Sequence, residues 1–447
     1  MALINKFSSP SIRGQVDLFG LPPTDTTVES SFYAEYKPLV NIQDSDGKIE
    51  FRIVGNTIHL LDLFDHFLYL KVKVVNGDST NLDSTHVIST ANLFFHSLFS
   101  KIEVFINGNL ISTSNLYHYK AFLETLLTFD NSYLESQGTC ALWYEDTDDG
   151  EVAVTNTGFT ERQGFIAESK RLEMIDKLRI DLANQHRYIL NNTTVVIALT
   201  KNTDSFSLMF PPPPPPVEGA APKATTTPAL VNPKVKFLEA SLFVRKNVLY
   251  PSIILSHQKL LEAGHSALYP FKMSDVKAFT ISQGNQVFIE ENMFLGAIPS
   301  RIVVALLPGS SFVGSYHENP FIFKDYGVQY MSLNVNNVPI PIKGMSLDFS
   351  GGGYLLPYYL MFCSLGMNGQ NHGLHITREK YKKLYPIFAF DVDQEHASDS
   401  TLTLEKSGTV RLELQFKTAL AHSVTCLVYC EHQKVMEIDK YRQAKVY

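Results

Sequence analysis

The sequence KIEVFING, residues 101–108, shows the pattern on which the fold of this chain depends. Ile102, Val104 and Ile106 occupy every second position of it. Successive side chains of a β-strand point to opposite faces, so this period predicts a strand with one buried face. Asn107-Gly108 follows at once, a pair typical of tight hairpins because both residues tolerate φ > 0. The stretch therefore predicts antiparallel β-structure.

The same two-residue period recurs along both halves of the 447-residue chain. It is found at residues 48–53 and 70–74 in the first half, and at residues 410–417 and 424–430 in the second. A chain of this length can bury two cores of about 200 residues each. Many strands joined by turn-rich connections predict two antiparallel sandwiches, although the alternation alone does not distinguish a jelly roll from an immunoglobulin-like topology.

Helical periodicity is limited to two short stretches. Leucines of residues 116–127 share a helical face, and Ser114 is the predicted N-cap. Residues 256–263 form the second predicted helix, which Gly264 is placed to end. Each helix lies between strands of its own half, so the predicted fold class is all-β with a few short helices.

A run of six prolines, residues 211–216, gives the clearest boundary signal in the chain. Such a run adopts an extended, stiff polyproline II conformation, which suits a spacer or surface loop. The predicted organisation is therefore an N-terminal arm over residues 1–46, a first sandwich over 47–205, a proline-rich linker or surface loop over 206–233, and a second sandwich with a C-terminal tail over 234–447. The arm is expected to leave the body and pair with a neighbour.

The charge balance argues against direct contact with nucleic acid. The formal net charge is −7, whereas proteins that coat nucleic acid present a basic face or tail. Two basic clusters are interpreted as solvated surface. They consist of Arg378, Lys380, Lys382 and Lys383, and of Lys440, Arg442 and Lys445.

The cysteines and apolar segments indicate a soluble protein made inside a cell. Cys426 and Cys430 lie on one face of an alternating stretch and are interpreted as buried apolar residues. Residues 1–20 lack the apolar core of a signal peptide. The longest apolar run, residues 354–365, is shorter than the roughly 20 residues that span a bilayer and contains Pro357.

One candidate metal site requires weighing, because some jelly rolls hold metals. His372, His375 and Glu379 could bind zinc or iron if they converged. Residues three apart point to opposite faces of a strand, and the glycines around His372 disfavour a helix. The histidine spacing also differs from the H-x-H of the cupin enzymes. An exposed polar loop is therefore the preferred interpretation, and no metal or cofactor is expected.

Other candidate motifs fail on spacing. An acidic run over residues 145–151 lacks the spacing of a calcium-binding loop and is interpreted as a solvated loop. Gly309–Gly314 does not fit the G-x-S-x-G of a nucleophile elbow. Gly351–Gly353 precedes no Lys-Ser or Lys-Thr pair, so it is not a P-loop. The sequence therefore predicts no enzyme and no catalytic residue.

Several blocks stand out along the chain: Asn92–Lys101 with the strand and turn that follow to Gly108, Tyr117–Leu127, Ala240–Lys246, Phe294–Val303, Asn319–Lys324 and Glu437–Arg442. In their order, and spread over roughly residues 48 to 443, they resemble the major capsid proteins of Polinton/Maverick elements and of adintoviruses. The proline run is unusual beside that group, and the first 40 or so residues and the last five are poorly covered.

The resemblance implies a double jelly roll, two antiparallel eight-stranded sandwiches in one chain. It further implies homotrimers that form pseudo-hexagonal capsomers and tile an icosahedral shell around double-stranded DNA. The implied partners are the chain itself, neighbouring capsomers, and penton and minor capsid proteins. The implied location is the virion capsid, after synthesis and assembly inside the host cell.

In such a protein the key blocks are architectural. His96–Phe99 is expected to fold back on the first sandwich, and Asn319–Lys324 to fix a loop on the second. The aromatic segments 312–326 and 354–362 suit contacts between copies, with core packing an equal contender. Two other functions stay open: a metal-dependent jelly-roll enzyme that uses His372, His375 or Glu379, and a host scaffold protein domesticated from a mobile element.

Overall fold

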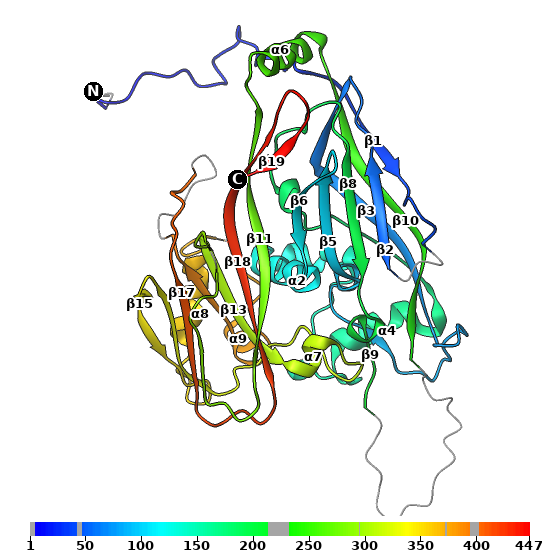
Figure 1. Ribbon diagram of the computed structural model, residues 1–447, viewed down its shortest axis with the longest axis vertical. Helices are drawn as coiled ribbons and strands as arrows, with labels where there is room; N and C mark the ends of the chain where they lie inside the picture. Colours follow the sequence, from blue (N-terminus) through cyan, green and yellow to red (C-terminus); the bar gives the residue numbers. More distant parts are fainter. Residues whose placement is uncertain (1–4, 43–46, 213–231, 295, 372, 394–401) are drawn as a thin grey trace, which may run out of the picture.

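The computed structural model describes the chain except residues 1–4, 43–46, 213–231, 295, 372 and 394–401. Two β-sandwiches stand side by side, and short helices lie between them and at their lower and upper ends (Figure 1). Residues 5–27 run outward from the body as an exposed extended segment (Figure 1). Of the six prolines, 213–216 lie outside the described residues.

The first sandwich consists of two four-stranded antiparallel sheets. One sheet has the order β1-β10-β3-β7 and the other β2-β8-β5-β6. Their bounds are β1 Val28–Tyr36, β2 Lys48–Ile53, β3 His59–Val75, β5 Phe99–Ile106, β6 Asn109–Ser114, β7 Arg171–Asp176, β8 Val195–Lys201 and β10 Lys234–Leu249.

The second sandwich also has two antiparallel sheets. Their orders are β11-β18-β13-β16 and β12-β17-β14-β15, and the short β19 (Ala444–Val446) pairs with β18. The bounds are β11 Ala267–Ile281, β12 Val287–Glu290, β13 Arg301–Pro308, β14 Val328–Val335, β15 Val338–Ser346, β16 Ile387–Asp391, β17 Val410–Phe416 and β18 Val424–Ile438.

The two sandwiches repeat one topology. When the eight sandwich strands of each half are numbered along the chain, both halves show the sheet orders 1-8-3-6 and 2-7-4-5. Strands that are distant in sequence, such as the first and eighth, are therefore neighbours in space, which is the arrangement of a jelly roll. The predicted fold class, a double jelly roll with a few short helices, is confirmed.

The short elements lie mostly in the connections between strands. A two-stranded ribbon pairs β4 (Ser89–Thr90) with β9 (Leu208–Met209). The helices of the first half are α1 Phe94–Ser97, α2 Tyr117–Thr128, α3 Asn131–Glu135, α4 Thr157–Ile166 and α5 Asp204–Ser207, with 3-10 turns η1 Gln137–Ala141, η2 Asp148–Gly150, η3 Ala167–Ser169 and η4 Asp181–Asn184. The remaining helices are α6 Pro251–Glu262, α7 Gly309–Val313, α8 Leu355–Ser364 and α9 Arg378–Lys383. No helix among the described residues is long and apolar enough to cross a membrane.

The alternation that predicted strands is also the pattern of burial. Ile102, Val104 and Ile106 of β5 are at most 3% exposed, and the apolar residues of β17 are fully buried. Asn107 and Gly108 both adopt positive φ, so the hairpin turn is confirmed. The predicted helices correspond to α2 and α6, but Ser114 is not the N-cap, because β6 extends through it and α2 begins after Leu116.

Two strands lie in a different unit from the one expected. Residues 28–36, assigned to the N-terminal arm, form β1 and pair with β10 at the edge of the first sandwich. Residues 234–249, assigned to the second sandwich, form β10 and pair with β3. The first sandwich therefore closes only after the proline-rich segment, because its eighth strand must lie between its first and third to complete the sheet.

Candidate functional site at the junction between the sandwiches

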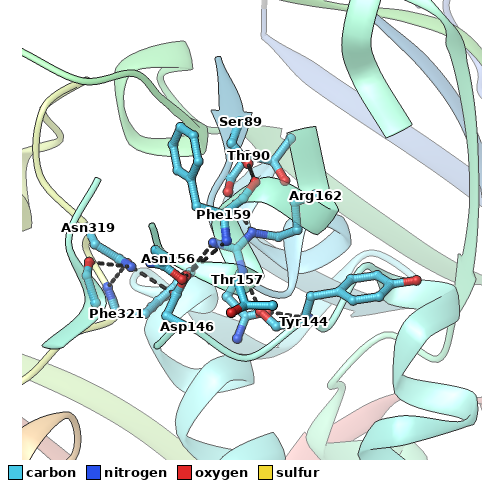
Figure 2. Close-up of polar contacts among 12 residues, drawn as sticks. Ser89, Thr90, Tyr144, Asp146, Asn156, Thr157, Phe159, Arg162, Asn319 and Phe321 are labelled. Atoms are coloured by element: carbon cyan, nitrogen blue, oxygen red, sulfur yellow. Dashed lines mark hydrogen bonds and ion pairs between the residues drawn. The ribbon is translucent and has the colours of Figure 1, made fainter. Parts of the chain in front are cut away.

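The connection between β6 and β7, residues 115–170, carries the first sandwich's side of a buried junction with the second. Its centre is Asp146, which is 2% exposed. The carboxylate accepts hydrogen bonds from Arg162 Nη2 at 2.6 Å, Asn156 Nδ2 at 3.0 Å and Asn319 Nδ2 at 2.8 Å (Figure 2). Asn319 belongs to the second half, so this one carboxylate links both halves.

Arg162 satisfies its guanidinium inside the protein. It projects from α4 and is fully buried. Besides the pair with Asp146, its Nε donates to the carbonyl of Thr90 at 2.9 Å, and its Nη1 donates to the carbonyl of Tyr144 (Figure 2). A buried ion pair is tolerated when further hydrogen bonds compensate for lost hydration, and that condition is met here.

The local sequence places α4 against this loop. Asn156 caps the helix, since its Oδ1 accepts from the backbone N–H of Phe159 at 3.3 Å and from that of Thr147 at 3.0 Å. Gly158 in the first turn lies against the backbone of Glu145, where a Cβ atom would collide. A residue without a side chain is therefore required for helix and loop to approach so closely.

The neighbouring carboxylate, Glu145, meets cations of the second half. Its Oε2 lies 2.5 Å from His375 Nε2 and 2.6 Å from Lys380 Nζ. Lys380 belongs to α9, which Thr377 caps with its side chain. The more exposed Lys383 of the same helix lies 3.5 Å from Asp149. The acidic run and the basic cluster, both interpreted as solvated, thus form an ion-pair network across the junction.

A second buried network joins the halves beside α2. Lys120 Nζ lies 2.6 Å from Asp181 Oδ1, and both side chains are almost fully buried. From β11 of the second half, Ser274 Oγ lies 2.6 Å from Glu124 Oε1 and 2.9 Å from Asp181 Oδ1, so its one hydroxyl proton can be donated to either carboxylate. Burial alone would lower the pKa of Lys120, but the charges of Asp181 and Glu124 outweigh it and raise that pKa. These neighbouring carboxylates therefore favour the charged form of Lys120 within the junction.

Aromatic rings fill the space between these polar networks. Phe122 of α2 stacks on Phe321 of the second half with centroids 4.2 Å apart and on Trp143 at 5.5 Å. Tyr119 contacts Phe321 edge-on at 5.8 Å. Burial of such rings and their pairwise contacts gives the junction its main apolar stabilisation. The Asn319–Lys324 block therefore fixes its loop against the first sandwich as well as the second.

The C-terminal turn makes a third contact between the halves. Arg442 donates to the backbone carbonyl of Asn191 at 2.9 Å and to its side-chain oxygen at 2.8 Å. The hairpin residue Asn107 donates in turn to the carbonyl of Arg442 at 2.7 Å. Burial lowers the pKa of Arg442. Arg442 is thus a packed residue rather than part of a solvated cluster.

The His96–Phe99 block stays within the first sandwich, as expected. His96 Nε2 lies 2.9 Å from Asp176 Oδ2, and its Nδ1 lies 2.8 Å from the Tyr117 hydroxyl. Burial lowers the pKa of His96, although Asp176 opposes the shift. Burial would raise the pKa of Asp176, but the hydrogen bond with His96 and the charge of Arg179 lower it.

The candidate metal ligands do not come together in the described part of the chain. His375 is engaged by Glu145 and Lys380, Glu379 is exposed on α9, and His372 lies outside the described residues. Across the described ranges no group of three or more metal-binding side chains is found. Cys426 and Cys430 are buried and free, as expected of apolar core residues, and burial raises the pKa of each to about 12.

Sequence reasoning did not find this junction. The acidic run lies more than 200 residues before His375 and the basic cluster in the chain, so no local pattern connects them. Two signals pointed toward it: opposite charge in two short clusters, and the Asn319–Lys324 block that was singled out as architectural. The buried polar and aromatic contacts of the junction hold the two sandwiches in one relative orientation.

Comparison with known proteins supports the fold along the whole chain. No protein-family model matches the sequence. An uncharacterized protein of Caenorhabditis elegans is 24% identical over 433 residues, which cover 94% of this chain and 98% of that protein.

Solved structures of viral proteins are similar over nearly the full length. A chain of the Sputnik virophage aligns with a TM-score of 0.66 at 11% identity, covering 100% of this chain and 94% of its own. The faustovirus major capsid protein gives 0.56 at 9% identity, with 97% and 92% covered. The mavirus major capsid protein gives 0.55 at 12% identity, with 100% and 96% covered. At these identities the likeness establishes the fold.

Proposed function

We propose that this chain is a major capsid protein that acts by self-assembly rather than by catalysis. The observation that carries the proposal is the repeated topology: two jelly rolls with the same strand order are fixed to each other within one chain. The whole chain aligns with proteins that are named major capsid proteins in faustovirus and mavirus. The proposed location is the virion capsid.

The repeat has a geometric consequence for assembly. Two similar sandwiches in one protomer present similar flanks, so three protomers around a three-fold axis place six sandwiches in a pseudo-hexagonal ring. Such rings can tile an icosahedral shell around double-stranded DNA. The proposed partners are copies of this chain and penton and minor capsid proteins. With a net charge of −7, direct DNA binding is not part of the proposal.

A fixed junction is what this geometry needs. A ring closes only if the angle between the two sandwiches is the same in every copy, and a hinge would allow open chains instead. The networks of Asp146 and of Asp181, together with the stacked Phe122 and Phe321, hold that angle by buried contacts. The junction is thus an assembly determinant rather than a reaction site.

The proposal is tested by the mass and shape of the purified full-length protein. Light scattering after size-exclusion chromatography should give three times the 50.2 kDa mass of the chain, and negative-stain electron microscopy should show particles with hexagonal outlines. A folded monomer at micromolar concentration, with no larger assembly, would overturn the capsid proposal.

The nematode relative favours a second candidate, a scaffold protein derived from a capsid gene and kept by an animal host. Its similarity runs over nearly the whole of both chains. Genes beside the coding sequence discriminate the two: a packaging ATPase, a protease and a DNA polymerase are expected only for a viral or mobile element. Elemental analysis of purified protein tests the metal-enzyme alternative, which requires a stoichiometric metal.

A further inference from the structure

Helix α8 presents an apolar surface that the described residues of this chain do not cover. Its ten residues, LLPYYLMFCS, include no charged side chain. Leu355, Leu356 and Tyr359 are 53%, 54% and 53% exposed. The solvent side of a surface helix is normally polar, so a helix of this composition indicates a surface that another molecule buries.

Strand β1, on the first sandwich, is a second element that the described part of the chain leaves exposed. None of its nine residues is buried. Phe32 and Tyr33, which point to opposite faces of the strand, are 44% and 48% exposed. In the sheet order β1 is terminal and pairs with β10. Figure 1 shows β1 and α8 on opposite flanks of the molecule.

The topological repeat relates these two surfaces to the internal junction. At the junction, the connection between the fifth and sixth strands of the first sandwich lies against the first strand of the second, β11. Ser274 of β11 contacts Glu124 of α2 at 2.6 Å, and α2 belongs to that connection. The corresponding connection of the second sandwich contains α8, and the strand that corresponds to β11 is β1.

We infer that α8 of one copy packs against β1 of the next copy. This inference rests on the proposed function, since it requires the ring of six sandwiches. The contact repeats between chains the arrangement that the junction makes within one chain. Two different patches meet, so the interface is head-to-tail, and three such contacts close a ring. Apolar and aromatic side chains on both patches suit a permanent interface.

A charge placed on α8 tests the inference against a matched control. Leu355→Asp is expected to convert the trimer into folded monomer, because an aspartate cannot be buried against β1 without a partner. Leu355 is the first residue of α8, where an acidic side chain does not disfavour a helix. The control is Leu255→Asp on α6, a leucine with the same 53% exposure, which should remain trimeric.

Cross-linking identifies the partner surface. Cys140→Ser and Cys363→Ser first remove the natural thiols that are not buried. Ser30→Cys on β1 and Leu356→Cys on α8 are then made in separate proteins, which are co-expressed and treated with a short bismaleimide. A covalent dimer is expected, which can form only between copies. The pair Ser256→Cys and Leu356→Cys, with one thiol moved to α6, should give none.

The outcomes separate this inference from the proposed function. If the wild-type protein is monomeric, both the proposed function and this inference are overturned. If the wild-type protein is trimeric, while Leu355→Asp also remains trimeric and the β1–α8 pair gives no dimer, the inference alone is overturned. Cross-linking of Leu356→Cys to itself would likewise overturn it, because it would show a symmetric contact between two α8 helices.

Discussion

The connection between the fifth and sixth strands has opposite surroundings in the two sandwiches. In the first, residues 115–170 lie against the second sandwich, and even the cations Lys120 and Arg162 are buried there. In the second, residues 347–386 carry the uncharged helix α8, whose Leu355 and Leu356 are half-exposed. The more polar connection is the more buried one. Burial therefore depends on the neighbour that each connection meets, and we expect the exposed apolar helix α8 to meet its neighbour in another copy.

The largest expected loss of stability comes from removing a buried cation from the connection of the first sandwich. Arg162→Met leaves the carboxylate of Asp146 buried without its cation, which is expected to cost about 3–5 kcal/mol in free energy of unfolding. Urea unfolding followed by fluorescence measures this directly at the junction, because the single tryptophan, Trp143, stacks on Phe122 there.

The matched control for that variant is Arg171→Met. Arg171 lies exposed on β7 of the same sandwich, so its replacement should change the free energy of unfolding by less than about 0.5 kcal/mol. Equal losses in the two variants would contradict the assignment of Arg162 to a buried structural pair.

A smaller effect on the free energy of unfolding is expected when the pH is lowered, and it should be larger for buried histidines of the first sandwich than for one of the second. Burial lowers the pKa of His66 to about 4 and that of His118 to about 3, and both belong to the first sandwich. In the unfolded state each histidine binds a proton below about pH 6.5, whereas in the folded state it stays neutral until the pH reaches its lowered pKa. The free energy of unfolding therefore falls as the pH drops from 6.5 toward the folded-state pKa. At pH 5 each should cost about 2 kcal/mol relative to pH 7.

Replacing one of these histidines checks that expectation. His118→Phe should reduce the loss of unfolding free energy between pH 7 and pH 5 by about 2 kcal/mol. His432→Phe is the comparison in the second sandwich: burial lowers its pKa too, but the side chain is only partly buried, so the reduction should be smaller. An unchanged pH dependence in His118→Phe would argue against a neutral, buried His118.

The smallest expected effect compares two lysines at the edge of the junction, one partly buried and one exposed. Lys380→Met removes a partly buried partner of Glu145 and is expected to cost about 1 kcal/mol, at the upper end for ion pairs near a surface. Lys383→Met, three residues along the same helix, removes only the exposed contact with Asp149 and should cost close to nothing. Urea unfolding of both variants compares them, and a larger loss for Lys383→Met would reverse the proposed ranking.

Much of the fold followed from local pattern. The two-residue period of residues 102–106 and 410–416 located strands and gave the correct buried face, because alternation is a property of the strand itself. The hairpin at Asn107-Gly108 followed from backbone conformation in the same way. The N-cap at Ser114 was wrong, because pairing with β5 extended β6 through that residue.

The candidate site was less accessible to sequence reasoning. Glu145, His375 and Lys380 were each assigned to an exposed region, since single charged residues usually are exposed. Their ion pairs join residues separated by more than 200 positions, and no local pattern reports such a distance. Asp146 was grouped with solvated neighbours for the same reason, although it is the most buried member of the run whose side chain is described.

The sequence by itself determined where strands form, which of their faces are apolar, and that the chain holds two β-rich halves, because these properties depend on residues next to each other. Tertiary structure decided which sandwich β1 and β10 complete and which charges meet at the junction. A strand's backbone hydrogen bonds can be satisfied by any partner strand of suitable length. The two-residue alternation of apolar residues therefore does not determine which strand is the partner. The partner is fixed by the sheet order of the folded sandwich, where β10 lies between β1 and β3.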